Sequence, residues 1–298
     1  MTTGEMTLSR RTAPGKTAPR RVMGAGKQLH AGPVTYVVLV VFALVSLAPL
    51  VWTAVAASRT NTRLAQTPPP LWFGGNLFKN LETAWDQAGM GTAMVNTTFV
   101  AGTITVGTVL FSTLAGFAFA KLRFRFSTTL LLLTIGTMMI PPQLAVVPLY
   151  LWMTDLHWAN HLQTVILPTL VSAFGTFFMR QYLVQALPTE LIEAARVDGA
   201  SSLRVVWHVV FPAARPAMAV LGLLTFVMAW NDFLWPIIAL NGDNPTVQVA
   251  LNQLGTGYIP DDSVIMAGAL LGTLPLLAAF LLFGKQIVGG IMQGAVKG

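Results

Sequence analysis

Long apolar segments alternate with shorter polar ones along most of the chain. Six of them approach the roughly 20 residues that an α-helix needs to cross about 30 Å of hydrocarbon. They lie at residues 33–57, 94–120, 127–151, 161–183, 213–239 and 263–284. The third contains Pro141, Pro142 and Pro148, which remove backbone donors, so we expect this span to be kinked or interrupted. The pattern predicts an all-α membrane protein with six transmembrane helices over residues 33–284.

A polar island, Leu187–Pro216, separates the fourth and fifth apolar segments. Pro188 and Thr189 are typical of a helix start, since a threonine oxygen can cap free N–H groups. Glu190 and Glu193 follow in the first turns, where the helix dipole favours negative charge. A short helix should therefore begin at this point.

The first helix of the island should be amphipathic and end at a tight bend. Leu191, Ala194 and Ala195 share one face at helical spacing. The run should stop at Asp198-Gly199, because glycine tolerates the left-handed geometry of a helix C-terminus.

A second short helix should follow, capped by Ser201 and halted by Pro212. Its apolar stripe comprises Leu203, Val206, Trp207 and Val210, whereas Arg204 and His208 face away. Two such helices are too polar to cross a bilayer and are tied to spans at both ends. We expect them to dock into a soluble partner; the alternative is a pair of helices lying on the lipid surface.

The distribution of basic residues predicts the orientation of the chain. With the N-terminus inside, fifteen of the eighteen Lys and Arg residues fall on the inner side, and the outer side holds only Arg59, Arg63 and Lys79. This asymmetry places both termini and the island in the cytoplasm of a cell whose plasma or inner membrane holds the chain. Residues 1–32 then form a disordered basic cytoplasmic tail, and residues 285–298 a C-terminal cytoplasmic tail. The net charge of +7 is accordingly an orientation signal and not a nucleic-acid footprint.

Composition excludes several other classes. Hydrophobic residues make up 54% of the chain and charged residues 10%, with a mean hydropathy of +0.65, which no single soluble domain of this length would show. No cysteine is present, so disulfides and thiol-ligated metals are excluded. His157 and His161 have the i, i+4 spacing of metal ligands but lack a clear third ligand. Gly15-Lys16-Thr17 resembles the end of a phosphate-binding loop, but Arg10 replaces its first glycine.

One cluster in the fifth span is a candidate solute path. Asp232 is the only acid within a predicted span, and a charge at the centre of a lipid-facing helix costs about 2.5–3.5 kcal/mol. Its neighbours Trp230, Asn231, Phe233 and Trp235 combine aromatic rings, which stack on sugar C–H faces, with polar groups that bind hydroxyls. The alternative is an interfacial aromatic belt with Asp232 at the water boundary.

Three further segments carry weaker expectations. The external stretch Ser58–Ala93 either faces an outside partner or caps the spans. Gly268 and Gly272 form a GxxxG pair, which permits close helix approach. Gly289–Gly298 is too glycine-rich to be a stable helix.

The string ELIEAARVDGA, followed by FPAARPA, resembles the EAA signature of ABC-importer permeases. Three further stretches, Met138–Met153, Met228–Ile237 and Gly289–Gly298, are similar to the carbohydrate-uptake branch, and most of all to the second permease of maltose-type importers. The resemblance implies a type I ABC-importer permease fold whose coupling helices sit in a cleft of a cytoplasmic ATPase. By motif match this role falls to Glu190, Glu193, Ala194, Ala195, Asp198 and Gly199.

The resemblance also implies partners. They are a sister permease forming a heterodimer, two ATP-binding subunits that hold ATP and Mg, an extracytoplasmic solute-binding protein, a sugar substrate and membrane lipid, but no nucleic acid. The chain itself would bind no cofactor and catalyse no reaction. In maltose-type relatives a tail like Gly289–Gly298 reaches between the ATPase subunits, which points to Gln293, Gly294 and Lys297.

Two other functional classes and a different cargo remain open. An ion-gradient transporter would carry several intramembrane acids or an inverted repeat, whereas one acid and no convincing repeat are found. A membrane enzyme would need titratable residues converging at one depth. Within the importer interpretation, the cargo could also be a polyol, glycerol phosphate or an oligosaccharide.

Overall fold

The computed structural model describes residues 32–256 and 260–295, and these residues contain helices but no strands. Contacts divide the chain into two units, residues 1–48 and 49–298. Helix α1 (Pro33–Ala57) begins in the first unit and ends in the second. It has a mean hydropathy of 2.6, as expected for a membrane span. Residues 1–31 of the predicted tail lie outside the described residues.

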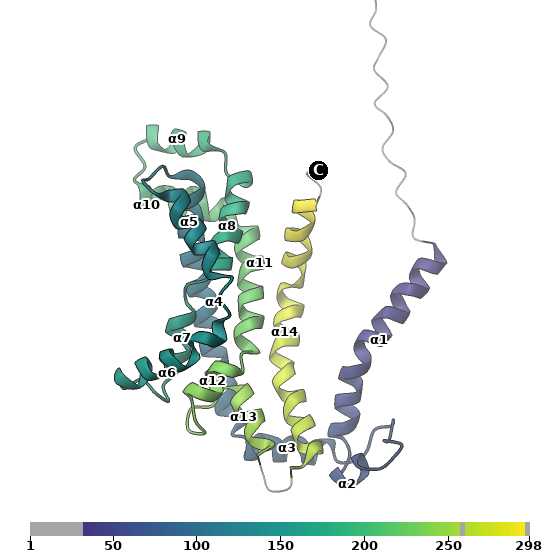
Figure 1. Ribbon diagram of the computed structural model, residues 1–298. Helices are drawn as coiled ribbons and strands as arrows, with labels where there is room; N and C mark the ends of the chain where they lie inside the picture. The colour runs from purple at the N-terminus through teal and green to yellow at the C-terminus, as the bar shows by residue number, and fades with distance from the viewer. Residues whose placement is uncertain (1–31, 257–259, 296–298) are drawn as a thin grey trace, which may run out of the picture. The chain divides into compact units, whose positions relative to one another are not determined.

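Four helices are long and apolar enough to cross a membrane, or six spans result if each of two bent pairs is counted as one. The pairs fall in the predicted third and fourth spans, and the described residues thus agree with the predicted six. In the second unit, α11 (Phe211–Trp230) packs against three other long helices (Figure 1). These are α4 (Met90–Lys121), α8 (Ala173–Ala186) and α14 (Asp262–Ala295).

Small residues set the closest approach in this bundle. A methyl group at Gly116 of α4 would lie 2.8 Å from the backbone nitrogen of Arg180 in α8, and one at Gly175 of α8 would meet Ser112 of α4. Packing of this kind, with hardly any side chain between the backbones, holds helices together where no hydrophobic effect operates between them.

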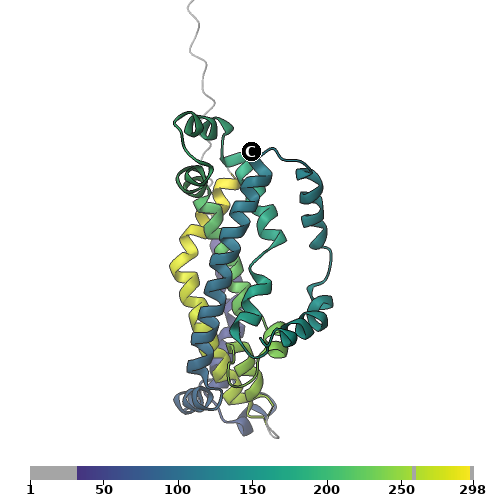
Figure 2. The same ribbon diagram turned by 90° about the vertical axis from the view of Figure 1, so that its left-hand side faces the viewer.

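The third span is broken where its prolines predict. Helix α5 (Ser127–Thr137) is followed by a 3₁₀ turn (Pro142–Ala145) and α6 (Val146–Asp155), and the axes bend by 89°. In Figure 2 these helices (dark teal) stand to one side of the other spans. No residue of α5 is buried, so its apolar side chains need lipid or another chain around them.

The fourth span has a break that the sequence did not predict. Helix α7 (Leu162–Ile166) and the 3₁₀ turn Leu167–Thr169 bend by 41° into α8. Ser172 starts the new helix, because its hydroxyl accepts a hydrogen bond from the Gly175 N–H at 3.0 Å.

Short helices cover the end of the unit opposite to α9 (Figure 1). They are α2 (Asn61–Leu64), α3 (Leu77–Gln87), α12 (Leu234–Ala239) and α13 (Val247–Leu254). The GxxxG pair allows close approach as predicted: methyl groups at Gly268 and Gly272 would lie 2.8 Å from side chains of α13, those of Leu254 and Val247.

The C-terminal segment is more helical than predicted. Helix α14 continues to Ala295, through Gln293 and Gly294, whereas Lys297 lies outside the described residues. The glycine argument fails here because each glycine weakens a helix by only about 1 kcal/mol, and extending an existing helix needs no new nucleus.

Candidate functional site

The polar island forms a helix, a bend and a second helix at one end of the bundle. Helix α9 (Thr189–Val197) begins at the predicted residue and carries Glu190 in its first turn. Pro188 occupies the N-cap position, with φ −59° and ψ 140°, and Thr189 is already helical. The predicted threonine cap is therefore wrong, and the fixed φ of proline begins the helix instead. We call Thr189–Val210 the elbow.

The bend of the elbow is closed by a Schellman motif. The Ala200 N–H donates to the Ala195 carbonyl at 2.9 Å, and the Gly199 N–H donates to the Arg196 carbonyl at 3.0 Å. Gly199 has a φ of +79°, a value that residues with a Cβ atom adopt only with strain. The predicted stop at Asp198-Gly199 is confirmed.

Helix α9 is held to the bundle by a different face from the one predicted. Ile192 is 5% exposed and packs in a cluster with Val205, Val210 and Leu183, whereas Leu191 is 51% exposed. Both residues are apolar and adjacent, and packing against α8 and the second helix decides which is buried.

The second helix begins as predicted but does not end where expected. The Ser201 hydroxyl accepts a hydrogen bond from the Arg204 N–H at 3.4 Å, which confirms the cap. Helix α10 (Ser202–Val205) then runs through a π-helical turn (Val206–Val210) directly into α11. Pro212 falls in the first turn after the π-helical turn, where its missing N–H is tolerated, so the predicted stop is wrong.

The continuous helix Ser202–Trp230 has 29 residues and includes a membrane span. The elbow is thus covalently and helically joined to the fifth span. No loop lies between the elbow and the fifth span.

Apolar side chains are exposed on the elbow among charged ones. Val197 is 88% exposed, and Leu191, Leu203 and Trp207 are each more than half exposed. The predicted stripe is therefore divided: Val206 and Val210 are buried, whereas Leu203 and Trp207 point outward. Among the matched residues, Glu190, Glu193, Ala194, Asp198 and Gly199 are exposed and Ala195 is half-buried. Exposed apolar groups of this size rimmed by charge are typical of protein interfaces.

The candidate solute residues lie at the far end of the same helix: Trp230 is the last residue of α11, Trp235 belongs to α12, and the other three lie between these helices. Trp230 is 1% exposed and its indole N–H donates to the Gly272 carbonyl of α14 at 3.1 Å. Trp235 is 7% exposed and donates to the Thr164 carbonyl at 3.0 Å. Both tryptophans are packed into the unit with their polar atoms satisfied.

The other three members of this cluster are more open. Asn231 is exposed and donates to the Val227 carbonyl at 2.8 Å, Phe233 is 44% exposed, and Asp232 is half-buried. Asp232 lies two residues beyond the end of α11, in the break before α12. The structure therefore separates the five predicted residues into two packing residues and three that face outward.

The sequence reasoning missed Ile192 and the π-helical turn. The only signal for Ile192 was its apolar character next to Leu191, and no sequence feature marked the π-helical turn. Among the described residues, no group of three or more His, Asp or Glu is placed to hold a metal ion.

Comparisons with known proteins agree with this architecture. Residues 108–291 match the family described as binding-protein-dependent transport system inner membrane component. The lactose transport system permease protein LacG of Rhizobium radiobacter is 33% identical over 269 residues, which cover 89% of this chain and 96% of that protein. The arabinooligosaccharides transport system permease protein AraQ of Halalkalibacterium halodurans is 30% identical over 260 residues, covering 86% and 93%.

Two further similarities extend this result. The sn-glycerol-3-phosphate transport system permease protein UgpE of Yersinia enterocolitica is 31% identical over 267 residues, covering 87% of this chain and 95% of that protein. A solved bacterial ABC transporter involved in the import of the acidic polysaccharide alginate matches with a TM-score of 0.73 and 22% identity, covering 85% and 94%.

The helical architecture of the described residues, with its two broken spans, has the fold of an ABC-importer permease, as the sequence predicted. The chain belongs to the binding-protein-dependent transport system inner membrane component family. Its members are transport permease subunits of the inner membrane.

Proposed function

We propose that this chain carries a sugar or oligosaccharide across the membrane as the permease subunit of an ATP-driven importer. The names of the relatives support a carbohydrate, with lactose and arabinooligosaccharides among them. A polyol phosphate is the alternative cargo, because one relative transports sn-glycerol-3-phosphate.

The observation that carries this proposal is the unbroken helix between the elbow and the fifth span. At 1.5 Å per residue, the 29 residues of Ser202–Trp230 form a lever about 43 Å long. The exposed side chains of Glu190, Leu191 and Glu193 on α9, at one end, would dock into an ATPase subunit. Closure of two such subunits on ATP would then tilt the lever, which is the coupling between distant sites that import requires.

The solute would pass the other end of the lever. We assign contact with it to Asn231, Asp232 and Phe233, which combine an amide, a carboxylate and an exposed ring. Trp230 and Trp235 support these residues from behind through the two indole hydrogen bonds.

The remaining subunits follow from the surfaces that the chain leaves uncovered. A sister permease would cover the apolar sides of α5 and α6, forming a heterodimer. The elbow would face the cytoplasm, as would both termini, with ATP and Mg held by two ATP-binding subunits. Gln293, Gly294 and Lys297 would reach the ATPase interface, and a solute-binding protein would deliver cargo to the opposite side.

The test measures solute uptake and ATP hydrolysis in proteoliposomes that hold the complete importer. Gly199→Pro cannot adopt the positive φ of the bend, and Glu193→Lys reverses an exposed charge on the docking face. We expect both variants to insert normally and to lose uptake together with solute-stimulated ATP hydrolysis. Lys79→Glu, a charge reversal on exposed α3, is the matched control and should transport normally.

Normal uptake in both elbow variants would remove the coupling role. Uptake that persists without ATP and stops when ion gradients are dissipated would instead place the chain among secondary transporters.

A further inference from the structure

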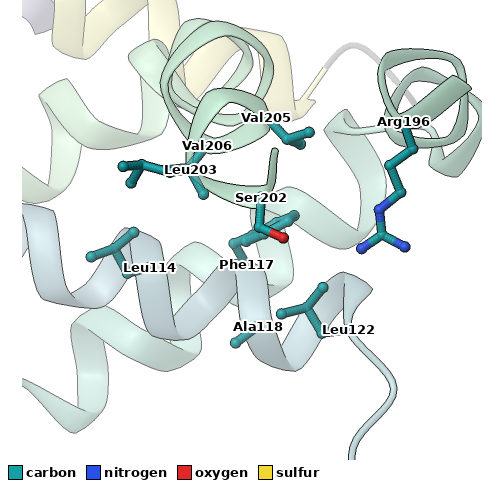
Figure 3. A pocket seen from close by; sticks show the side chains of 9 residues that line it. All are labelled: Leu114, Phe117, Ala118, Leu122, Arg196, Ser202, Leu203, Val205 and Val206. Atoms are coloured by element: carbon teal, nitrogen blue, oxygen red, sulfur yellow. The ribbon is translucent and has the colours of Figure 1, made fainter. Parts of the chain in front are cut away.

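An apolar groove of about 260 Å³ lies between the elbow and the last turns of α4. The side chains that line it come from two facing walls (Figure 3). They are Leu114, Phe117 and Ala118 on α4, Leu122 just after it, and Arg196, Ser202, Leu203, Val205 and Val206 on the elbow. Only Arg196 and Ser202 bring polar side chains to this lining.

The position of the groove along α4 sets the depth of its occupant. Helix α4 is a candidate membrane span that ends at Lys121. Helix α4 has 32 residues and is about 48 Å long, more than the roughly 30 Å of hydrocarbon. A span centred in the bilayer would therefore carry its last two turns, which the groove follows, into the headgroup region. The Lys121 ammonium donates to the Val184 carbonyl of α8 at 3.4 Å, which ties the end of this span to its neighbour.

The groove is apolar along its length and cationic at its rim. Figure 3 shows the Arg196 guanidinium at the end of the groove nearest Leu122. No carboxylate lines the groove. An occupant that fits this pattern has an apolar chain and an anionic head, and it enters from the membrane boundary.

We propose that the groove binds an anionic phospholipid, with an acyl chain along Phe117 and Val206 and its phosphate at Arg196. A zwitterionic lipid offers the same chain but carries a cation beside this arginine, so charge selects the anionic headgroup. The lipid would lie between α4 and the elbow, at a contact that changes if the elbow moves relative to α4. Binding itself does not depend on the transport role proposed above.

The test uses the complete importer in nanodiscs of phosphatidylcholine that contain a phosphatidylglycerol with a photoreactive acyl chain. After illumination, mass spectrometry should locate the lipid on peptides that span Leu114–Leu122 and Ser202–Val206. One surface arginine contributes roughly a fivefold preference for anionic lipid. We therefore expect Arg196→Gln to lower this labelling about fivefold, and photoreactive phosphatidylcholine to label wild type about fivefold less.

Two further variants keep the test decisive. Ala118→Phe retains every charge but fills the groove, so it should also lose the labelling. Arg204→Gln removes a charge from the same elbow outside the groove lining and should label like wild type. If Arg196→Gln or Ala118→Phe does not fold, the loss of labelling in the other variant is sufficient.

Three outcomes would overturn the proposal. Equal labelling by the two lipids would mean ordinary contact with the bilayer. Labelling that survives both Arg196→Gln and Ala118→Phe would place the lipid elsewhere. Absence of labelling in the wild-type importer would mean that no phosphatidylglycerol enters the groove, for example because a partner subunit covers it.

Discussion

Ile192 and Leu191 are adjacent in α9, and exchanging each for alanine separates the anchoring of the elbow from its docking face. Ile192 is 5% exposed within the cluster that holds α9 to the bundle, so Ile192→Ala should cost about 3 kcal/mol, within the range for buried Ile to Ala. That free energy corresponds to roughly a hundredfold higher population of states in which α9 is detached. Leu191 is 51% exposed, and Leu191→Ala should change this equilibrium by less than about 0.5 kcal/mol.

Hydrogen exchange of the amides of α9 measures this opening directly. In the chain purified without ATPase subunits, which would themselves protect α9, the peptide Thr189–Val197 should exchange up to about a hundredfold faster in Ile192→Ala and at the wild-type rate in Leu191→Ala. Uptake should fall in both variants. In Leu191→Ala, however, the loss should follow weaker binding of the ATPase subunit. Equal acceleration of exchange in the two variants, or none in Ile192→Ala, would refute the assignment of Ile192 as the anchor.

Two further predictions concern packing and the solute path. Gly116→Ala should lower the thermal stability of the chain and the yield of assembled importer in a melting and assembly assay, because the added methyl group meets the α8 backbone. Gly102→Ala is the control: its methyl group would meet no other part of the chain, so it should lower neither quantity. Trp230→Phe removes the hydrogen bond to Gly272 and should cost about 1 kcal/mol of stability without changing the half-saturating solute concentration for uptake. Phe233→Ala should raise that concentration with little effect on melting, and the reverse pattern in these two variants would reject the proposed division of the cluster.

The spans and the break in the third span could be predicted from the sequence because both are local properties. Apolar length identifies a helix that crosses a bilayer, and the Pro141-Pro142 pair interrupts a helix in any surroundings. The bend between α7 and α8 follows a lone Pro168 in an apolar run, and a single proline did not distinguish a bend from a straight span. Its position depends on the Ser172 cap, which becomes visible only in the folded chain.

The elbow shows the same division between local and tertiary effects. Gly199 and Ser201 were identified because backbone geometry and capping depend on a few neighbouring residues. Pro212 was misjudged, because the rule against proline assumes α-helical bonding in the preceding turn and the π-helical turn changes that bonding. Which of Leu191 and Ile192 is buried depends on α8, which no spacing rule on α9 can supply.

The candidate solute cluster illustrates a further limit. Aromatic and polar residue types indicate what chemistry is present. The sequence does not distinguish a tryptophan that stacks on a sugar from one whose indole donates to a backbone carbonyl. Trp230 and Trp235 became packing residues only once Gly272 and Thr164 were seen opposite their N–H groups.

The buried hydrogen bond between Trp230 and Gly272 fixes one end of the long helix to α14. A tilt imposed at Ser202 therefore turns about a fulcrum at Trp230, and displacement declines along the helix in proportion to the distance from that point. Pro216, halfway along, travels about half as far as Ser202, and the segment that follows Trp230 hardly moves. Displacement of the elbow would thus open and close the solute path on the side of the elbow. Opening on the opposite side would require movement of other segments, and the bent third and fourth spans are the candidates.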